Sequence, residues 1–232
     1  MAQHIIPGAP PITVVLRPSS RARRISLRVS RLDGKVTLTV PRGVSAAQAL
    51  GFAEEKQDWL RQQLAKQPAQ VTIALGAQVP VAGRERVIVA GTGRSVVLGQ
   101  ETLAVPGKPD QVARRVQTYL KDLARHRLSE AVDHYAMRLG RAPSRMTLRD
   151  TRSRWGSCSS AGALMFSWRL VMAAPEVLDY VAAHEVAHLQ EMNHSQAFWD
   201  VVMRLHGPYE TPRRWLRTDG QVLHRYRFED RG

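Results

Sequence analysis

The segment from Pro175 to Leu189 constrains the fold more than any other part of the chain. It contains no glycine and no internal proline, and Pro175 followed by Glu176 suits the first turn of a helix. Apolar residues recur at helical spacing on two opposite sides, at Val177, Val181, Leu178, Ala182, Val186 and Leu189. A helix that is apolar on both sides has no face suited to water, so we predict that this helix is buried.

Two histidines and a glutamate interrupt this apolar helix, as His184, Glu185 and His188. Histidines four positions apart on a helix lie one above the other, so both imidazoles can reach one point in space. A polar group that is removed from water without a partner costs free energy, so the three residues require a function. Their spacing is the H-E-x-x-H pattern of zinc hydrolases, in which the histidines bind the ion and the glutamate transfers protons.

A zinc site that keeps one position open for water needs a third protein ligand, and two residues could provide it. Glu191 lies on the same predicted stripe as the two histidines. His194 could turn back towards the ion if Asn193 ended the helix in the left-handed conformation. Ser195 would then cap a further helix from Gln196 to Leu205. We favour His194, because imidazole is the commonest metal ligand, and keep Glu191 as the alternative.

Further motifs surround this helix, namely Arg154-Trp155-Gly156-Ser157-Cys158-Ser159, Trp168-Arg169-Leu170, Asp179-Tyr180-Val181, Asn193-His194-Ser195 and Phe198-Trp199. Others stand near the N-terminus, namely Arg23-Arg24-Ile25-Ser26-Leu27-Arg28-Val29, Val40-Pro41 and Trp59-Leu60. Together with the zinc motif, they resemble the YgjP-like family of zinc metallopeptidases, which is similar to the SprT and WLM groups of zincins. The resemblance covers most of the chain and is strongest from Leu148 to Trp199. One departure is Ser167, where the family often has asparagine.

This resemblance implies a zincin-like fold that binds one zinc ion per chain. The zinc ligands would be His184, His188 and His194, and Glu185 would be the catalytic base. The resemblance also implies that the strand from Ala163 to Leu170 is an edge strand beside the metal. An extended polypeptide substrate could add to such an edge as a further strand.

Three residues outside the zinc motif could contact the substrate. Arg154 and Arg169 could bind it directly or pair with acidic side chains. Tyr209 could donate a hydrogen bond to the oxyanion that forms during hydrolysis. Cys158 lies outside the motif, and we expect it to be a small buried residue rather than a ligand.

Residues 1–105 predict a β-rich N-terminal domain with one helix over about 45–66, for which Ser45 is the cap. The expected strands are 12–16, 25–29, 36–40, 71–75, 79–82, 87–90, 96–98 and 102–105. Asp33-Gly34 predicts a hairpin turn between the second and the third of them. Pro106-Gly107-Lys108-Pro109 predicts the boundary to a second domain, 106–232.

The second domain begins with a long helix that Asp110 would cap and Gly140 would end. Short strands are expected at 146–148, 152–159 and 163–170. We therefore predict an α+β fold. A β-rich domain would be followed by a zincin-like domain with a long backing helix, a small mixed sheet and the active-site helix.

The formal net charge of the chain is +14, which attracts polyanions and makes nucleic acid a possible partner. The densest basic cluster has no aromatic residues interleaved to stack on bases, and comprises Arg17, Arg21, Arg23, Arg24, Arg28 and Arg31. The single cysteine cannot form an internal disulfide, and no signal peptide or transmembrane segment is expected. These features predict a cytoplasmic protein without a membrane partner.

Three classes of function remain open. The first is a zinc metallopeptidase that hydrolyses peptide bonds by activating water at the metal, and a basic surface could recruit such a protease to DNA. The second is a hydrolase of nucleotide phosphoanhydride bonds at the same site, which the positive charge favours but which no glycine loop for phosphate supports. The third is a binding module with structural zinc, whose closed four-ligand shell would include both His194 and Glu191.

Overall fold

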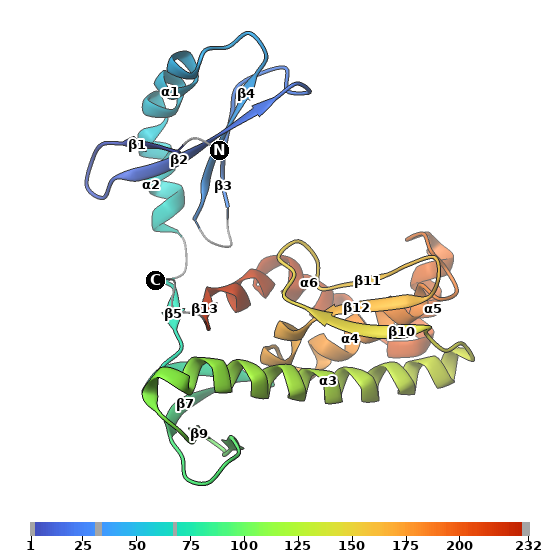
Figure 1. The fold of residues 1–232 in the computed structure, drawn as a ribbon. Coiled ribbons are helices and arrows are strands. Elements are labelled where there is room, and N and C mark those ends of the chain that lie inside the picture. The colour runs from blue at the N-terminus through green and yellow to red at the C-terminus, as the bar shows by residue number, and fades with distance from the viewer. Residues whose placement is uncertain (1–2, 31–33, 67–68, 229–232) are drawn as a thin grey trace. The chain divides into compact units, whose positions relative to one another are not determined.

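The computed structural model describes residues 3–30, 34–66 and 69–228. The chain forms two compact units, residues 1–69 and residues 70–232 (Figure 1). This division falls at residue 69, whereas the sequence predicted a boundary at residue 105. The strands between the two positions belong to the second unit because their apolar side chains share one core with the long helix that follows, among them Val79, Val81, Ile88, Leu103 and Val105.

The first unit is a four-stranded sheet with two helices. Its strand order is β1 (Gln3–Ile6), β2 (Ile12–Ser19), β4 (Val36–Pro41) and β3 (Ser26–Val29). Strand β4 is parallel to β2 and antiparallel to β3. The two helices are α1 (Ala46–Glu55) and α2 (Gln57–Ala65).

Local sequence signals explain the helices of this unit. Ser45 caps α1 as predicted, and its hydroxyl accepts a hydrogen bond from the backbone N–H of Gln48. The single predicted helix is broken at Lys56, which ends α1 and precedes α2. Asp33 of the predicted hairpin turn lies outside the described residues, while Gly34 beside it has a φ of 67°.

The second unit begins with a small sheet of order β6 (Gln78–Val81), β7 (Arg84–Ala90), β9 (Thr102–Val105) and β8 (Val97–Leu98). Strand β5 (Val71–Thr72) pairs instead with β13 (Tyr226–Arg227), near the other end of the chain. The turn between β6 and β7 is attached to residues 171 and 172. Its residues Ala82 and Gly83 donate backbone hydrogen bonds to the carbonyls of Val171 and Met172.

A long helix, α3 (Val112–Leu139), follows a short 3-10 turn, η1 (Pro109–Gln111). It ends at Gly140, whose φ of 74° lies in the left-handed region, as predicted. Asp110 lies within the 3-10 turn and does not cap α3. The buried side of α3 packs against α4 (Pro175–Ala187) and η2 (Trp168–Met172), so α3 has the predicted role of a backing helix (Figure 1).

Three strands form the sheet beside α4, in the order β10 (Arg145–Arg149), β12 (Ala163–Ser167) and β11 (Gly156–Cys158). Strand β12 is parallel to β10 and antiparallel to β11, so the sheet is mixed. The prediction that the segment from Ala163 is the edge strand was wrong. Leu164 and Phe166 are almost fully buried and place β12 at the centre, and β11 is the edge strand that contacts α4.

The chain ends with α5 (Gln196–His206), α6 (Glu210–Thr218) and η3 (Gly220–Arg225). Several small sheets packed with helices confirm the predicted α+β class. Over the described ranges, no helix has both the length and the apolar character needed to cross a bilayer.

Candidate metal centre

The helix α4 is buried on both sides, as its sequence predicts, and it packs against α3, α5 and α6. It ends at Ala187, so His188 is its C-terminal cap. The chain then forms a turn of the 3-10 type, in which the N–H groups of Leu189 and Gln190 donate hydrogen bonds to carbonyls three residues back. The prediction of a left-handed Asn193 was wrong, since Ala82 alone has a positive φ among the described residues other than glycine.

This turn brings three imidazoles together. The candidate ligand atoms of His184, His188 and His194 all lie within 4.8 Å of one another. The Nε2 atoms of His184 and His194 are 3.1 Å apart. Two nitrogens bound to one tetrahedral zinc ion, at 2.0–2.1 Å each, are separated by about 3.3 Å. The spacing of the imidazoles therefore fits a shared zinc ion.

Glu191, the alternative third ligand, has a different position. Its side chain does not join the group of candidate ligands in the described part of the chain. Its backbone carbonyl instead accepts a hydrogen bond of 2.9 Å from Nδ1 of His188. Because Nδ1 carries the proton, Nε2 of His188 keeps a lone pair for a metal.

Two aromatic residues hold the imidazole rings. Phe198 on α5 is fully buried and contacts the rings of all three histidines, with centroid distances of 4.5 to 4.8 Å. The hydroxyl of Tyr180 on α4 lies 3.5 Å from Nδ1 of His184. These contacts fix the ring orientations before any ion binds.

The surroundings favour neutral imidazoles, which are the form that binds metals. Burial lowers the pKa of His184 to about 3, and the charges of His188 and His194 lower it further. Burial also lowers the pKa of His188, although its hydrogen bond to Glu191 acts in the opposite direction. The neutral imidazoles of His184 and His188 are thus suited to bind a divalent zinc ion.

Glu185 lies beside the histidines and is only 5% exposed. Burial raises the pKa of its carboxyl to about 8, while the charge of Arg154 acts to lower it. A divalent cation at the histidines would also lower this pKa, because it stabilises the carboxylate. The carboxyl packs so closely on the backbone of β11 that a Cβ added to Gly156 would lie 2.5 Å from Oε1.

A cavity of about 530 Å³ opens onto these groups. Its lining comprises Ser153, Arg154, Gly156, Ser157, Cys158, His184, Glu185, His188, Met192 and His194. The edge strand β11 thus forms one wall, and the end of α4 with the following turn forms the other. Arg154 is exposed in this wall, as a residue that contacts substrate would be.

Two of the predicted substrate contacts lie elsewhere, since neither Arg169 nor Tyr209 lines this cavity. Arg169 is buried, and its guanidinium bonds to both carboxylate oxygens of Asp150, at 2.7 and 3.1 Å. Tyr209 stacks on Trp199, with ring centroids 5.0 Å apart. Arg169 is thus paired with an acid, one of the two roles expected for it. The ring of Trp199 lies 5.7 Å from that of His194, and a hydrogen bond from Tyr209 to the oxyanion stays a prediction.

Cys158 lines the cavity but is not part of the candidate ligand group in the described residues. Burial raises the pKa of its thiol, and the neighbouring Glu185 raises it further. The thiolate that would bind a metal is therefore disfavoured. The side chain is half-buried and borders the cavity, whereas the sequence led us to expect a buried residue.

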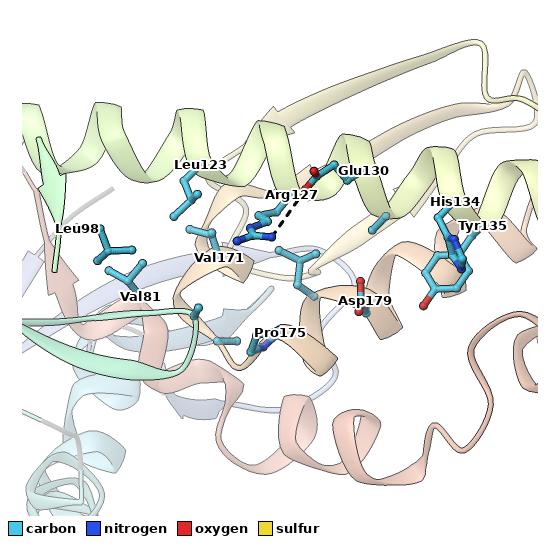
Figure 2. A pocket seen from close by; sticks show the side chains of 14 residues that line it. Val81, Leu98, Leu123, Arg127, Glu130, His134, Tyr135, Val171, Pro175 and Asp179 are labelled. Carbon is cyan, nitrogen blue, oxygen red and sulfur yellow. Dashed lines mark ion pairs between the residues drawn. The ribbon is translucent and has the colours of Figure 1, made fainter. Parts of the chain in front are cut away.

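A second cavity, of about 430 Å³, lies at the start of α4 and was not predicted from the sequence. Figure 2 shows apolar side chains at one end, such as Leu98 and Leu123, and polar ones towards the other, such as Asp179. Arg127 and Glu130 form an ion pair of 3.8 Å along its wall. None of the three clustered histidines borders this cavity.

The sequence did not predict the contacts of Phe198 and Tyr180 with the imidazoles, nor that of Gly156 with Glu185. Each lies within a motif that we noted, but only the folded chain shows what it contacts. Phe198 follows Ser195 by three residues, and this spacing could have indicated a side chain turned back towards His194. No comparable local signal points from Gly156 to Glu185, which is 29 positions later.

One comparison with known proteins, the match to a family, agrees with this chemistry. The crystal structure of the metallopeptidase zymogen of Pyrococcus abyssi abylysin is similar, with 19% identity and a TM-score of 0.36, over 40% of this chain and 95% of that one. Curated proteins give no match. The family described as YgjP-like, metallopeptidase domain, matches residues 23–219, which is most of the chain. The chain therefore belongs to the YgjP-like family of metallopeptidases, as its motifs led us to expect, and is a zinc-dependent hydrolase.

Proposed function

We propose that the chain hydrolyses peptide bonds at a single zinc ion held by His184, His188 and His194, with Glu185 as the general base. The convergence of the three imidazoles beside a buried carboxylate is the observation that carries this proposal. Both groups face one cavity, so a substrate bound there could reach them together.

The zinc ion would activate the water molecule, and the protein would transfer protons and orient the ligands. A zinc ion with three protein ligands acts as a Lewis acid and lowers the pKa of a water molecule from about 15.7 towards 7. Glu185 takes the proton of the attacking water on a carboxylate oxygen and passes it to the nitrogen of the leaving amine. The carbonyl of Glu191 holds His188 in the tautomer that presents Nε2.

The edge strand β11 explains how a polypeptide could be placed. Its only strand partner in the described residues is β12, so its other edge is available for pairing. An extended substrate that pairs with this edge has its backbone fixed along the cavity wall. Arg154, in the same wall, is the candidate to hold a substrate carbonyl oxygen or carboxylate.

Removal and return of the metal tests this function. We expect the zinc-loaded chain to cleave unfolded casein or a mixed peptide library. A chelator should abolish the cleavage, and stoichiometric Zn²⁺ should restore it. Mg²⁺ should not restore it, because magnesium prefers oxygen ligands to imidazole. Cleavage that survives complete removal of metal, or turnover of nucleotides without turnover of peptides, would refute the proposal.

The substitution Gly156→Ala tests the position of Glu185. A methyl group at this position overlaps the carboxyl, with 2.5 Å to Oε1 and 2.6 Å to Cγ, so the side chain must move. A displacement of about 1 Å in an active site can cost ~100-fold in rate. We expect kcat to fall by about that factor while zinc content is unchanged.

Gly51→Ala is the matched control, because a Cβ at Gly51 meets no atom within 4 Å. This variant should keep full activity. A Gly156→Ala enzyme that retained the wild-type kcat would show that the close packing of β11 on Glu185 is not needed for catalysis.

A further inference from the structure

The positive charge of the chain is concentrated in the first unit. Residues 1–69 contain eleven lysines and arginines against four acidic residues, a net charge of +7. Half of the net charge of +14 thus lies in less than a third of the sequence. This unit contains none of the residues of the metal centre.

Within this unit, the two faces of the sheet differ in character. One face carries the apolar residues that pack under α1 and α2, such as Ile12, Val14 and Leu38. Side chains alternate along strands, so the intervening residues point to the opposite face. On β2, β4 and β3 these are mainly polar, namely Thr13, Arg17, Thr37, Thr39, Ser26 and Arg28.

The strand register gathers these residues into rows across the sheet. Arg17 is level with Thr39, which is level with Ser26, and Thr37 is level with Arg28. Residues 20–25 connect the end of β2 to the start of β3, so Arg21, Arg23 and Arg24 lie at one end of the sheet. We call Arg17, Arg21, Arg23, Arg24 and Arg28 the basic face.

All five arginines of the basic face are exposed. None of them forms a side-chain hydrogen bond or an ion pair within the described part of the chain. The acidic residues of the unit that the structure describes, Glu54, Glu55 and Asp58, lie on the two helices, which cover the other face of the sheet. Lys56, Arg61 and Lys66 accompany these acids on the helix side and balance their charge. The positive charge of the basic face has no such balance.

We propose that the basic face binds the phosphate backbone of double-stranded nucleic acid. Unpaired guanidinium groups interleaved with threonine and serine hydroxyls are the groups that contact phosphate oxygens. The aromatic residues of the unit, Phe52 and Trp59, lie on the helices, so the face has no rings for stacking on the bases of a single strand. The exposed large apolar side chains of the unit in the described residues are Ile5 on β1 and Trp59 on α2, which do not form a patch that could insert into a membrane.

A salt series on the zinc-loaded full chain tests this proposal. Binding to a fluorescent 24-base-pair duplex is followed by anisotropy between 50 and 200 mM KCl. Each phosphate contact that is lost should reduce the slope of log K against log[salt] by about 0.9. We expect the variant R17Q/R21Q/R24Q/R28Q to bind at least tenfold more weakly at 50 mM KCl, with a slope smaller by roughly 3.6.

The control variant R114Q/R125Q/R214Q/R217Q removes the same charge from exposed positions of the second unit. It should change the affinity by less than about twofold, because the contacts are local and exposed charges are screened by salt. The variant R17K/R21K/R24K/R28K keeps the charge and should retain binding. If the fourfold glutamine variant did not fold, R17Q/R28Q should still reduce the slope by about 1.8.

Three results would overturn the proposal. One is the absence of duplex binding by the wild-type chain at 50 mM KCl. The second is an equal loss in the glutamine variant and its control, which would mean that net charge alone attracts the duplex. The third is tighter binding to a single strand of the same length, or to phosphatidylserine vesicles, than to the duplex.

Discussion

Replacement of Glu185 by glutamine should leave zinc in the protein and lower kcat by about 10²- to 10⁴-fold, the usual contribution of a general base. Glutamine has nearly the same shape as glutamate and fits the same space against β11. It cannot accept the proton of the attacking water. Steady-state kinetics on a cleaved peptide, together with elemental analysis of zinc, measures both effects.

Glu191→Gln is the matched control, since it makes the same chemical change six residues later in the sequence. Only the backbone carbonyl of Glu191 contacts His188, and this group is unchanged. The control should keep its zinc and its activity. Full turnover by the Glu185→Gln enzyme would remove Glu185 from the mechanism. A loss of zinc in Glu191→Gln would instead indicate that the side chain of Glu191 is a zinc ligand.

Replacement of His188 by alanine should remove both zinc and activity. The variant keeps two of the three imidazoles. Loss of a residue that only hydrogen-bonds to a metal ligand weakens metal binding ~10- to 100-fold, and loss of a ligand itself should weaken it more. A ligand that binds only the folded state stabilises it by about 2.7 kcal/mol at 100 times its Kd. Zinc should therefore raise the melting temperature of the wild-type chain and leave that of the variant unchanged.

His126→Ala controls for the loss of an imidazole. His126 lies on α3, and its exposed side chain pairs only with Glu130 in the described residues. The control should bind zinc and gain stability from it as the wild-type chain does. A His188→Ala variant that bound zinc as tightly as this control would show that His188 is not a ligand.

Much of the site could be predicted because its signals are local. The spacing of His184 and His188 on a helix needs only the helical repeat, and Ser195 before α5 marks a helix start. Gly140 ends α3 in the left-handed conformation for the same kind of reason. Structure that depends on a few consecutive residues can be predicted without knowledge of the fold.

The features that failed depend on residues far apart in the sequence. Strand order in the sheet beside α4 follows from pairing between β12 and two strands that lie elsewhere in the sequence, β10 and β11. The residue pattern of one short strand does not reveal its partners. Pro106 to Pro109 indicated a domain boundary but marks a turn before α3, because the preceding strands pack on that helix. For Arg169 the sequence allowed a substrate contact or an acidic partner, and only the fold, which places Asp150 beside it, shows the partner.

Anomalous diffraction at the zinc edge, from crystals of the zinc-loaded chain, tests the central claim most directly. We expect one peak per chain, 2.0–2.1 Å from a nitrogen of each of His184, His188 and His194, with a solvent oxygen in the fourth position. No peak among the three imidazoles would contradict the account, as would a fourth protein ligand such as Glu191 that closes the coordination shell.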